Sequence, residues 1–218
     1  MSDTGGRPDE LGPDESALPP ERTATATFGM GCFWGPDARF GALPGVVRTR
    51  VGYAGGTKRN PQYHSLGDHT EVVQIEYDPD RLTYRDLLGV FWANHSPTAA
   101  SKRQYRSLVL VHDGTQQELA DRSVVATEDR LGRSVETAVE PLDRFTLAEE
   151  YHQKYELRST PVLGDELVDI YGDDLVDSTV AARLNGFVAG HGNEETKRAV
   201  LAGLSLPPSV LSEVQRRL

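Results

Sequence analysis

Alternating apolar and polar residues predict several β-strands along the chain. Residues 69–78 place Val73, Ile75 and Tyr77 on one face, with more polar side chains between them, and residues 23–28 alternate threonine with alanine. This period of two is typical of a strand with one buried face. Three further segments rich in β-branched residues are expected strands: 46–56, 107–113 and 135–142.

Segments with helix start and stop signals separate these strands. Thr83 and Asp86 have the spacing of a capping box, which predicts a helix over residues 82–95. Three more helices are expected in this part of the chain: 34–44, 115–132 and 145–155. Because strands alternate with helices, the predicted fold class is α+β or α/β, with a mixed sheet in a two-layer core.

The strand signals stop near Pro161. Beyond it the chain contains four short helical segments that end at glycine or proline: 162–172, 177–190, 194–203 and 207–218. We therefore expect residues 161–218 to form a helical C-terminal extension. The pattern leaves two arrangements open, a helical subdomain packed on the sheet or a small independent bundle.

The first residues of the chain differ from both of these regions. Residues 1–22 are rich in aspartate, glutamate, proline and glycine and offer little to bury, so a disordered acidic tail is predicted. Residues 23–160 then form the central domain, which carries all the strand signals and the candidate chemistry described below.

Composition narrows the possible partners. Hydrophobic residues make up 38% of the chain and charged residues 26%, as expected of a globular protein with a core. No stretch of about 18 apolar residues and no signal peptide are found, so no membrane segment is expected. The net charge of −10 argues against nucleic acid or an anionic membrane as a partner.

The chain contains a single cysteine, Cys32, within the sequence GMGCFWG. One cysteine excludes an internal disulfide and a cysteine-rich zinc site, and a free thiol without an export signal favours the cytoplasm. Pro36 fits the first turn of a helix, whose positive end would favour the nucleophilic thiolate. The alternative is a buried cysteine that acts as a small apolar residue.

Three other side chains are candidates for the same site. Glu71 begins a half-buried strand, where desolvation would raise its pKa and make it a proton donor; the alternative is a solvated residue at a strand end. Tyr63 and Tyr105 lie in or next to loops and can face a shared pocket; the alternative for Tyr63 is a tyrosine at the edge of the core with its hydroxyl in water. Of the six histidines, His69 is expected closest to this site. The histidines lack an HExxH pattern, so we expect no metal.

Several short motifs together resemble one known family. They follow one another in the order and approximate spacing of the peptide methionine sulfoxide reductases of the A type, over about residues 24 to 158: GCFWG, GYAGG, NPQY, HTEVV, YDP, LLGVFW, HSPT, RQYRS and AEEYHQKY. The resemblance implies the fold of that family and the reduction of methionine-S-sulfoxide, free or in a peptide, to methionine, as in the repair of oxidised proteins.

The resemblance also implies roles for individual residues. Cys32 matches the nucleophile and Glu71 the proton donor. Tyr63 and Tyr105 match the tyrosines that hydrogen-bond the sulfoxide oxygen, and Phe33 and Trp34 match the aromatic walls that receive the S-methyl group. Reduction would leave Cys32 as a sulfenic acid, a reversible oxidation state.

The sequence departs from the family pattern in three respects. It has no resolving cysteine, so an external thiol, either a thioredoxin-like protein or a small thiol, is expected to regenerate Cys32 without any bound cofactor. The loop around residues 99–103 is short and lacks an aspartate that usually contacts the substrate backbone. Asp37 and Ser96 replace a usual glutamate and a usual aspartate.

Two other functions remain open at this point. One is a degenerate relative that binds methionine sulfoxide or another ligand without turnover; the presence of Cys32, Glu71, Tyr63 and Tyr105 together argues against it. The other is a thiol peroxidase, which would surround its thiolate with Thr or Ser and Arg rather than with Phe33 and Trp34. We expect the protein to act as a monomer.

Overall fold

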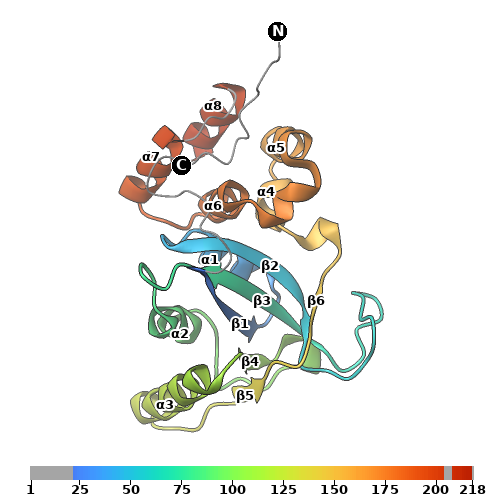
Figure 1. Ribbon diagram of the computed structural model, residues 1–218, viewed down its shortest axis with the longest axis vertical. Coiled ribbons are helices and arrows are strands. Elements are labelled where there is room, and N and C mark those ends of the chain that lie inside the picture. The colour runs from blue at the N-terminus through green and yellow to red at the C-terminus, as the bar shows by residue number, and fades with distance from the viewer. Residues whose placement is uncertain (1–21, 204–207, 218) are drawn as a thin grey trace.

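A six-stranded sheet forms the centre of the computed structural model, which describes residues 22–203 and 208–217. The strands lie in the order β5-β4-β1-β3-β2-β6. Their bounds are β1 Ala24–Met30, β2 Val46–Ala54, β3 Thr70–Tyr77, β4 Ser107–Val111, β5 Ala138–Pro141 and β6 Phe145–Leu147. Figure 1 shows α2 and α3 beside the sheet and the C-terminal helices at one end of it.

The sheet is mixed, as predicted. Neighbouring strands are antiparallel except for β4 and β5, which are parallel. A parallel pair requires a crossover connection, and helix α3, Gly114–Leu131, supplies it. The five predicted strands correspond to β1 through β5, whereas β6 was not expected.

The helices next to the sheet begin and end where the sequence signals them. Helix α1 spans Trp34–Gly41 and α2 spans Tyr84–Ala93. Thr83 and Asp86 form the predicted capping box, and Gly132 ends α3 in a left-handed conformation with φ of 66°. Apolar residues of α1, α2 and α3 join those of β1, β3 and β4 in one buried cluster, which fixes the sheet that carries the site.

The helix predicted over residues 145–155 is wrong. Phe145–Leu147 form β6 on the edge of the sheet, Glu150–His152 form a 3₁₀ turn, and a short helix α4 spans only Tyr155–Arg158. Pairing with β2 outweighs the local helix preference of this segment. Gly52 of β2 makes the pairing possible, because a Cβ there would lie 2.4 Å from the Phe145 ring.

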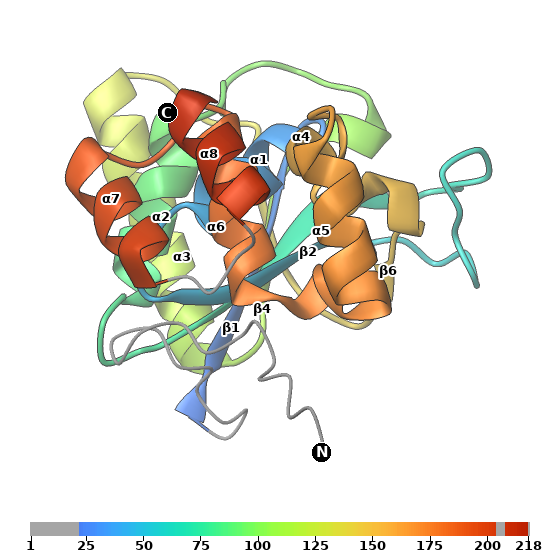
Figure 2. The ribbon, with the colours of Figure 1, turned by 90° about the horizontal axis from the view of Figure 1, so that it is seen from above.

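The four helices predicted beyond Pro161 are present. Their bounds are α5 Leu163–Tyr171, α6 Thr179–Val188, α7 Glu194–Gly203 and α8 Pro208–Arg217. Figure 2 shows them gathered over α1, and α6 makes the most extensive contact with it. Ala42 and Leu157 are buried in the same cluster as residues of these helices.

The predicted boundary between a domain that ends at residue 160 and a helical extension that starts at residue 161 stays a prediction. Residues 1–21 of the expected acidic tail lie outside the described residues. Among the helices that the structure describes, none combines the length and apolarity that crossing a bilayer requires.

Candidate active site

Cys32 lies in the tight connection between β1 and α1. Gly31 has φ of 92°, a conformation that residues with a Cβ rarely adopt, so this glycine permits the turn. Pro36 occupies the first turn of α1, as predicted. Cys32 forms no disulfide and is reached by solvent, although neighbouring atoms partly desolvate its thiol, so it is accessible for reaction.

Glu71 lies on β3, the strand next to β1, and is 1% exposed. Its Oε2 accepts a hydrogen bond from the backbone N–H of Phe33 at 3.2 Å, and its Oε1 accepts one from Nε2 of Gln104 at 2.7 Å. Burial raises the pKa of Glu71, and these two hydrogen bonds oppose the rise. The structure therefore places a desolvated carboxyl group directly beside the turn that carries Cys32.

The two tyrosines approach this carboxyl group from separate segments. Tyr63 lies in the connection between β2 and β3, and Tyr105 ends a 3₁₀ turn that leads into β4. Burial, the charge of Glu71 and a hydrogen bond with Tyr63 raise the pKa of Tyr105 to about 12. The Tyr105 phenol therefore stays protonated at neutral pH and can donate a hydrogen bond.

Phe33 and Trp34 form an aromatic wall next to Cys32. Phe33 is 1% exposed and packs against Tyr53, with ring centroids 6.0 Å apart. Trp34 is half-buried and stacks on Tyr155, with centroids 3.7 Å apart and an angle of 4° between the rings. Phe33 therefore belongs to the floor of the site, and Trp34 presents the more accessible apolar surface.

His152, rather than His69, packs among these aromatic rings, which corrects the expectation from the sequence. His69 is buried and its Nε2 lies 2.8 Å from the carbonyl oxygen of Lys58. His152 contacts the rings of Phe33, Trp34 and Tyr63.

Two observations define the protonation state of His152. Its Nδ1 accepts a hydrogen bond from Trp34 Nε1 at 3.2 Å, and burial lowers its pKa. The indole nitrogen can only donate, so Nδ1 carries no proton and the neutral ring is protonated on Nε2. His152 thus holds Trp34 in place without adding a positive charge near Cys32.

The expected lowering of the Cys32 pKa is not found. Partial burial raises the pKa of the thiol, and the negative charges of Glu71 and Glu156 raise it further, while a hydrogen bond from the Trp34 backbone lowers it. The hydrogen bond at the start of α1 therefore lowers the pKa of Cys32, as expected, but the rise caused by desolvation is larger.

Four supporting residues were not assigned a role from the sequence: Gln104, Glu149, His152 and Tyr155. All four lie within the motifs RQYRS and AEEYHQKY, so the signal was present but did not show which side chains face the site. Glu149 accepts hydrogen bonds from the Tyr63 backbone at 2.9 Å and from the Tyr53 hydroxyl at 2.7 Å. It thereby ties the Tyr63 segment to the sheet.

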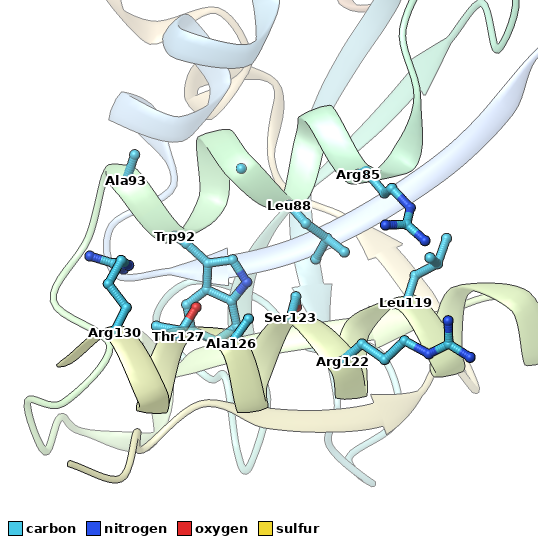
Figure 3. A pocket seen from close by; sticks show the side chains of 11 residues that line it. Arg85, Leu88, Trp92, Ala93, Leu119, Arg122, Ser123, Ala126, Thr127 and Arg130 are labelled. Carbon is cyan, nitrogen blue, oxygen red and sulfur yellow. The ribbon is translucent and has the colours of Figure 1, made fainter. Parts of the chain in front are cut away.

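A separate groove lies between α2 and α3, with a volume of about 560 Å³. Figure 3 shows Arg85, Arg122 and Arg130 at its rim and Trp92 on its floor. Its lining residues do not include any of the candidate site residues, which are Cys32, Phe33, Trp34, Tyr63, Glu71 and Tyr105. In the described part of the chain, no group of three or more His, Cys, Asp or Glu side chains is arranged to hold a metal ion.

An accessible thiol, a buried carboxyl group and an apolar wall lie together on this mixed sheet, an arrangement suited to thiol chemistry. The family follows from comparison with known proteins. A family model described as peptide methionine sulfoxide reductase matches residues 24–170. The chain belongs to this family, and the match extends beyond the motifs that end near Arg158.

Individual relatives agree with this assignment. A peptide methionine sulfoxide reductase from Drosophila melanogaster is 43% identical over 189 residues, covering 85% of this chain and 76% of the relative. Peptide methionine sulfoxide reductase A5 from Oryza sativa is 42% identical over 174 residues, covering 77% and 68%.

Solved structures show the same fold. Reduced Mxr1 from Saccharomyces cerevisiae superposes with a TM-score of 0.60 at 30% identity, covering 66% of this chain and 90% of that one. Methionine sulfoxide reductase A of Corynebacterium diphtheriae gives a TM-score of 0.57 at 28% identity, covering 70% and 85%. The predicted fold class is thereby confirmed.

Proposed function

We propose that this protein reduces methionine-S-sulfoxide to methionine, with Cys32 as nucleophile and Glu71 as proton donor. The observation that carries the proposal is the buried Glu71 carboxyl group beside the only thiol of the chain. A sulfoxide sulfur is a poor electrophile until its oxygen is protonated. A carboxyl group whose pKa is raised by burial can supply that proton near neutral pH.

The reaction proceeds in balanced steps. Glu71 protonates the sulfoxide oxygen, Tyr63 and Tyr105 hydrogen-bond it, and the Cys32 thiolate forms a bond to the sulfoxide sulfur. With a second proton the oxygen leaves as water. A water molecule then attacks the Cys32 sulfur and releases one proton to solvent, which balances the second proton consumed. The bond between the two sulfurs breaks with its electron pair going to methionine, and Cys32 becomes a sulfenic acid.

The cycle closes through an external thiol. The chain has one cysteine, so no second cysteine can reduce the sulfenic acid. Two equivalents of a thiol, from a thioredoxin-like protein or a small molecule, convert it back to the Cys32 thiol with release of a disulfide and water. The proposal places the enzyme in the cytoplasm as a monomer, with its reacting residues all within positions 23–160.

The preference for the S epimer follows from fixed positions around the sulfur. The methyl group lies against Trp34 over the floor formed by Phe33, and the oxygen lies towards the two tyrosines. The R epimer cannot satisfy both positions while it presents its sulfur to Cys32.

The direct test is turnover of each methionine sulfoxide epimer with dithiothreitol as reductant. We expect methionine from the S epimer only, and none with Cys32→Ser, because serine is a far weaker nucleophile. Equal use of both epimers would contradict the assigned positions. Binding of the sulfoxide without any turnover would instead identify a non-catalytic relative.

A further inference from the structure

A buried polar cluster connects the first turn of α1 to helix α6. Asp37 of α1 is 0% exposed, and its Oδ2 accepts hydrogen bonds from Nδ2 of Asn185 at 3.2 Å and from the backbone N–H of Lys154 at 3.1 Å. The hydroxyl of Thr49 and the ammonium of Lys154 contact Oδ1. A buried carboxylate requires such donors, and the donor from α6 is Asn185.

Asn185 uses both ends of its amide group. It is 0% exposed, and its Oδ1 accepts a hydrogen bond from the Leu157 backbone N–H at 3.0 Å. One side chain of α6 therefore joins α1, through Asp37, to α4, through Leu157. If the amide were turned by 180°, its oxygen would face the Asp37 carboxylate and its NH₂ group would face the Leu157 N–H, and neither pair could form a hydrogen bond.

The backbones of α1 and α6 approach closely at two glycines. A Cβ on Gly186 would lie 2.4 Å from the carbonyl oxygen of Ala38, and a Cβ on Gly41 would lie 2.4 Å from that of Ala182. Arg183, which is 1% exposed, donates hydrogen bonds to the carbonyl oxygens of Gly41 and Val46. Helix α6 thus holds α1 at both its beginning and its end.

The turn that Asp37 belongs to starts one residue after Cys32. The backbone N–H of Asp37 donates to the carbonyl oxygen of Phe33 at 3.0 Å, and the N–H of Phe33 donates to Glu71. Any shift of this turn changes the place of Cys32 relative to the carboxyl group of Glu71.

We propose that Asn185 is a positioning residue for Cys32, so that α6 belongs to the catalytic unit. The turnover part of this inference rests on the proposed function, whereas the reactivity of the thiol does not. Cys32 is the only cysteine. Its alkylation by iodoacetamide therefore reports its environment in the full-length protein, whatever the substrate.

The test compares Asn185→Leu with Ser178→Ala. Leucine has a similar size but removes both amide hydrogen bonds. Ser178 caps α6 by accepting a hydrogen bond from the Ala181 N–H at 3.1 Å and makes no contact with Asp37, so its loss weakens the helix without altering the cluster. Asn185→Ser, which keeps a small polar group, serves as a gentler variant should Asn185→Leu fail to fold.

We expect Asn185→Leu to lower kcat and the alkylation rate about tenfold each, with KM within about twofold, because a small misplacement of reacting groups is costly. Asn185→Ser should show a smaller change in the same direction, and Ser178→Ala should leave both rates within about twofold of the parent.

Two outcomes overturn the inference. One is that folded Asn185→Leu has the same kcat and alkylation rate as Ser178→Ala. If Asn185→Leu does not fold, the same result in Asn185→Ser overturns the inference. The other is an equal loss of both rates in Ser178→Ala. If the parent protein turns over neither epimer, the proposed function fails, and the alkylation rates alone still decide the role of Asn185.

Discussion

Cys32 and Glu71, the two candidate reacting groups, both have pKa values above their ordinary ones. Burial is the main cause for both groups, and the charge of Glu71 adds to the rise at Cys32. In the proposed mechanism the reactive form is a thiolate beside a carboxylic acid, which differs from a thiol beside a carboxylate by the position of one proton. The two groups therefore titrate as a coupled pair.

Replacing Glu71 with glutamine should separate these two effects. Glutamine cannot deliver a proton, so sulfoxide reduction should fall by about 10² to 10⁴, the usual range for general acid catalysis. It also removes a negative charge, which should lower the pKa of Cys32 and move its alkylation profile to lower pH.

The measurements are the pH dependence of kcat/KM and of iodoacetamide alkylation. The kcat/KM of the wild-type enzyme should rise with pH as the pair loses its first of two protons, with a midpoint above the ordinary glutamate pKa. Glu71→Gln should lack this rise. Rates close to wild type at pH 7 in this variant would remove Glu71 from the chemistry.

The fate of the oxidised sulfur provides a second prediction at this scale. Because the chain has a single cysteine, the sulfenic acid on Cys32 should persist when no reductant is present. One equivalent of methionine-S-sulfoxide, followed by a dimedone-type trap and mass spectrometry, should yield one adduct on Cys32. Release of methionine without an adduct would require a different oxidised product.

Among the elements, the connection between β2 and β3 depends on one carboxylate from a distant segment. Both oxygens of Glu149 are used, one by the Tyr63 backbone and the other by the Tyr53 hydroxyl. Glu149 lies two residues after the end of β6, so the unexpected edge strand determines where Tyr63 lies.

Glu149→Ala should therefore weaken catalysis although Glu149 is not assigned to the chemistry. We expect kcat/KM to fall about tenfold, since loss of the tie lets Tyr63 leave the position where it would polarise the S–O bond. Tyr53→Phe removes only the second hydrogen bond and is the matched control, expected to cost about 1 kcal/mol of stability with little loss of activity. Unchanged kcat/KM in Glu149→Ala would show that the loop holds Tyr63 without this contact.

The same elements show what the sequence reveals and what it does not. The alternation in β3 and the capping box of α2 are local signals, so both elements and the burial of Glu71 could be predicted. The place of His152 depends on β6 pairing with β2, a long-range contact that the local pattern of residues 145–155 conceals. Likewise, no local signal shows that Asn185 reaches Asp37, 148 positions away.

For the whole molecule, the question is how far the C-terminal helices are part of one folding unit. Leu157 and Ala42 are buried together with Leu163, Leu184 and Phe187 in a cluster to which α5 through α8 contribute. The functional boundary predicted at residue 160 therefore crosses a continuous apolar core, because the helices beyond it cover residues that precede it.

Two truncations test this arrangement. A chain that ends at residue 160 uncovers Leu157, worth about 1.5–3 kcal/mol, and removes the Asn185 hydrogen bond to a charged group, worth about 1.5–3 kcal/mol. It also removes the Arg183 contacts to α1 and β2. The first two losses alone reach the lower end of the total stability of a typical domain, about 5–15 kcal/mol, so we expect no cooperative thermal unfolding and no turnover.

A chain that ends at residue 203 is the matched control. It lacks α8, which packs mainly on α5 and α6, but keeps every contact between α6 and α1. We expect a lower melting temperature with kcat preserved to within about twofold, since Asp37 and the turn after Cys32 keep their partners. Both expectations are tested by calorimetry and by turnover of each sulfoxide epimer, measured on the two truncated chains. A chain ending at residue 160 that unfolds cooperatively and reduces the S epimer would show that residues 23–160 are self-sufficient.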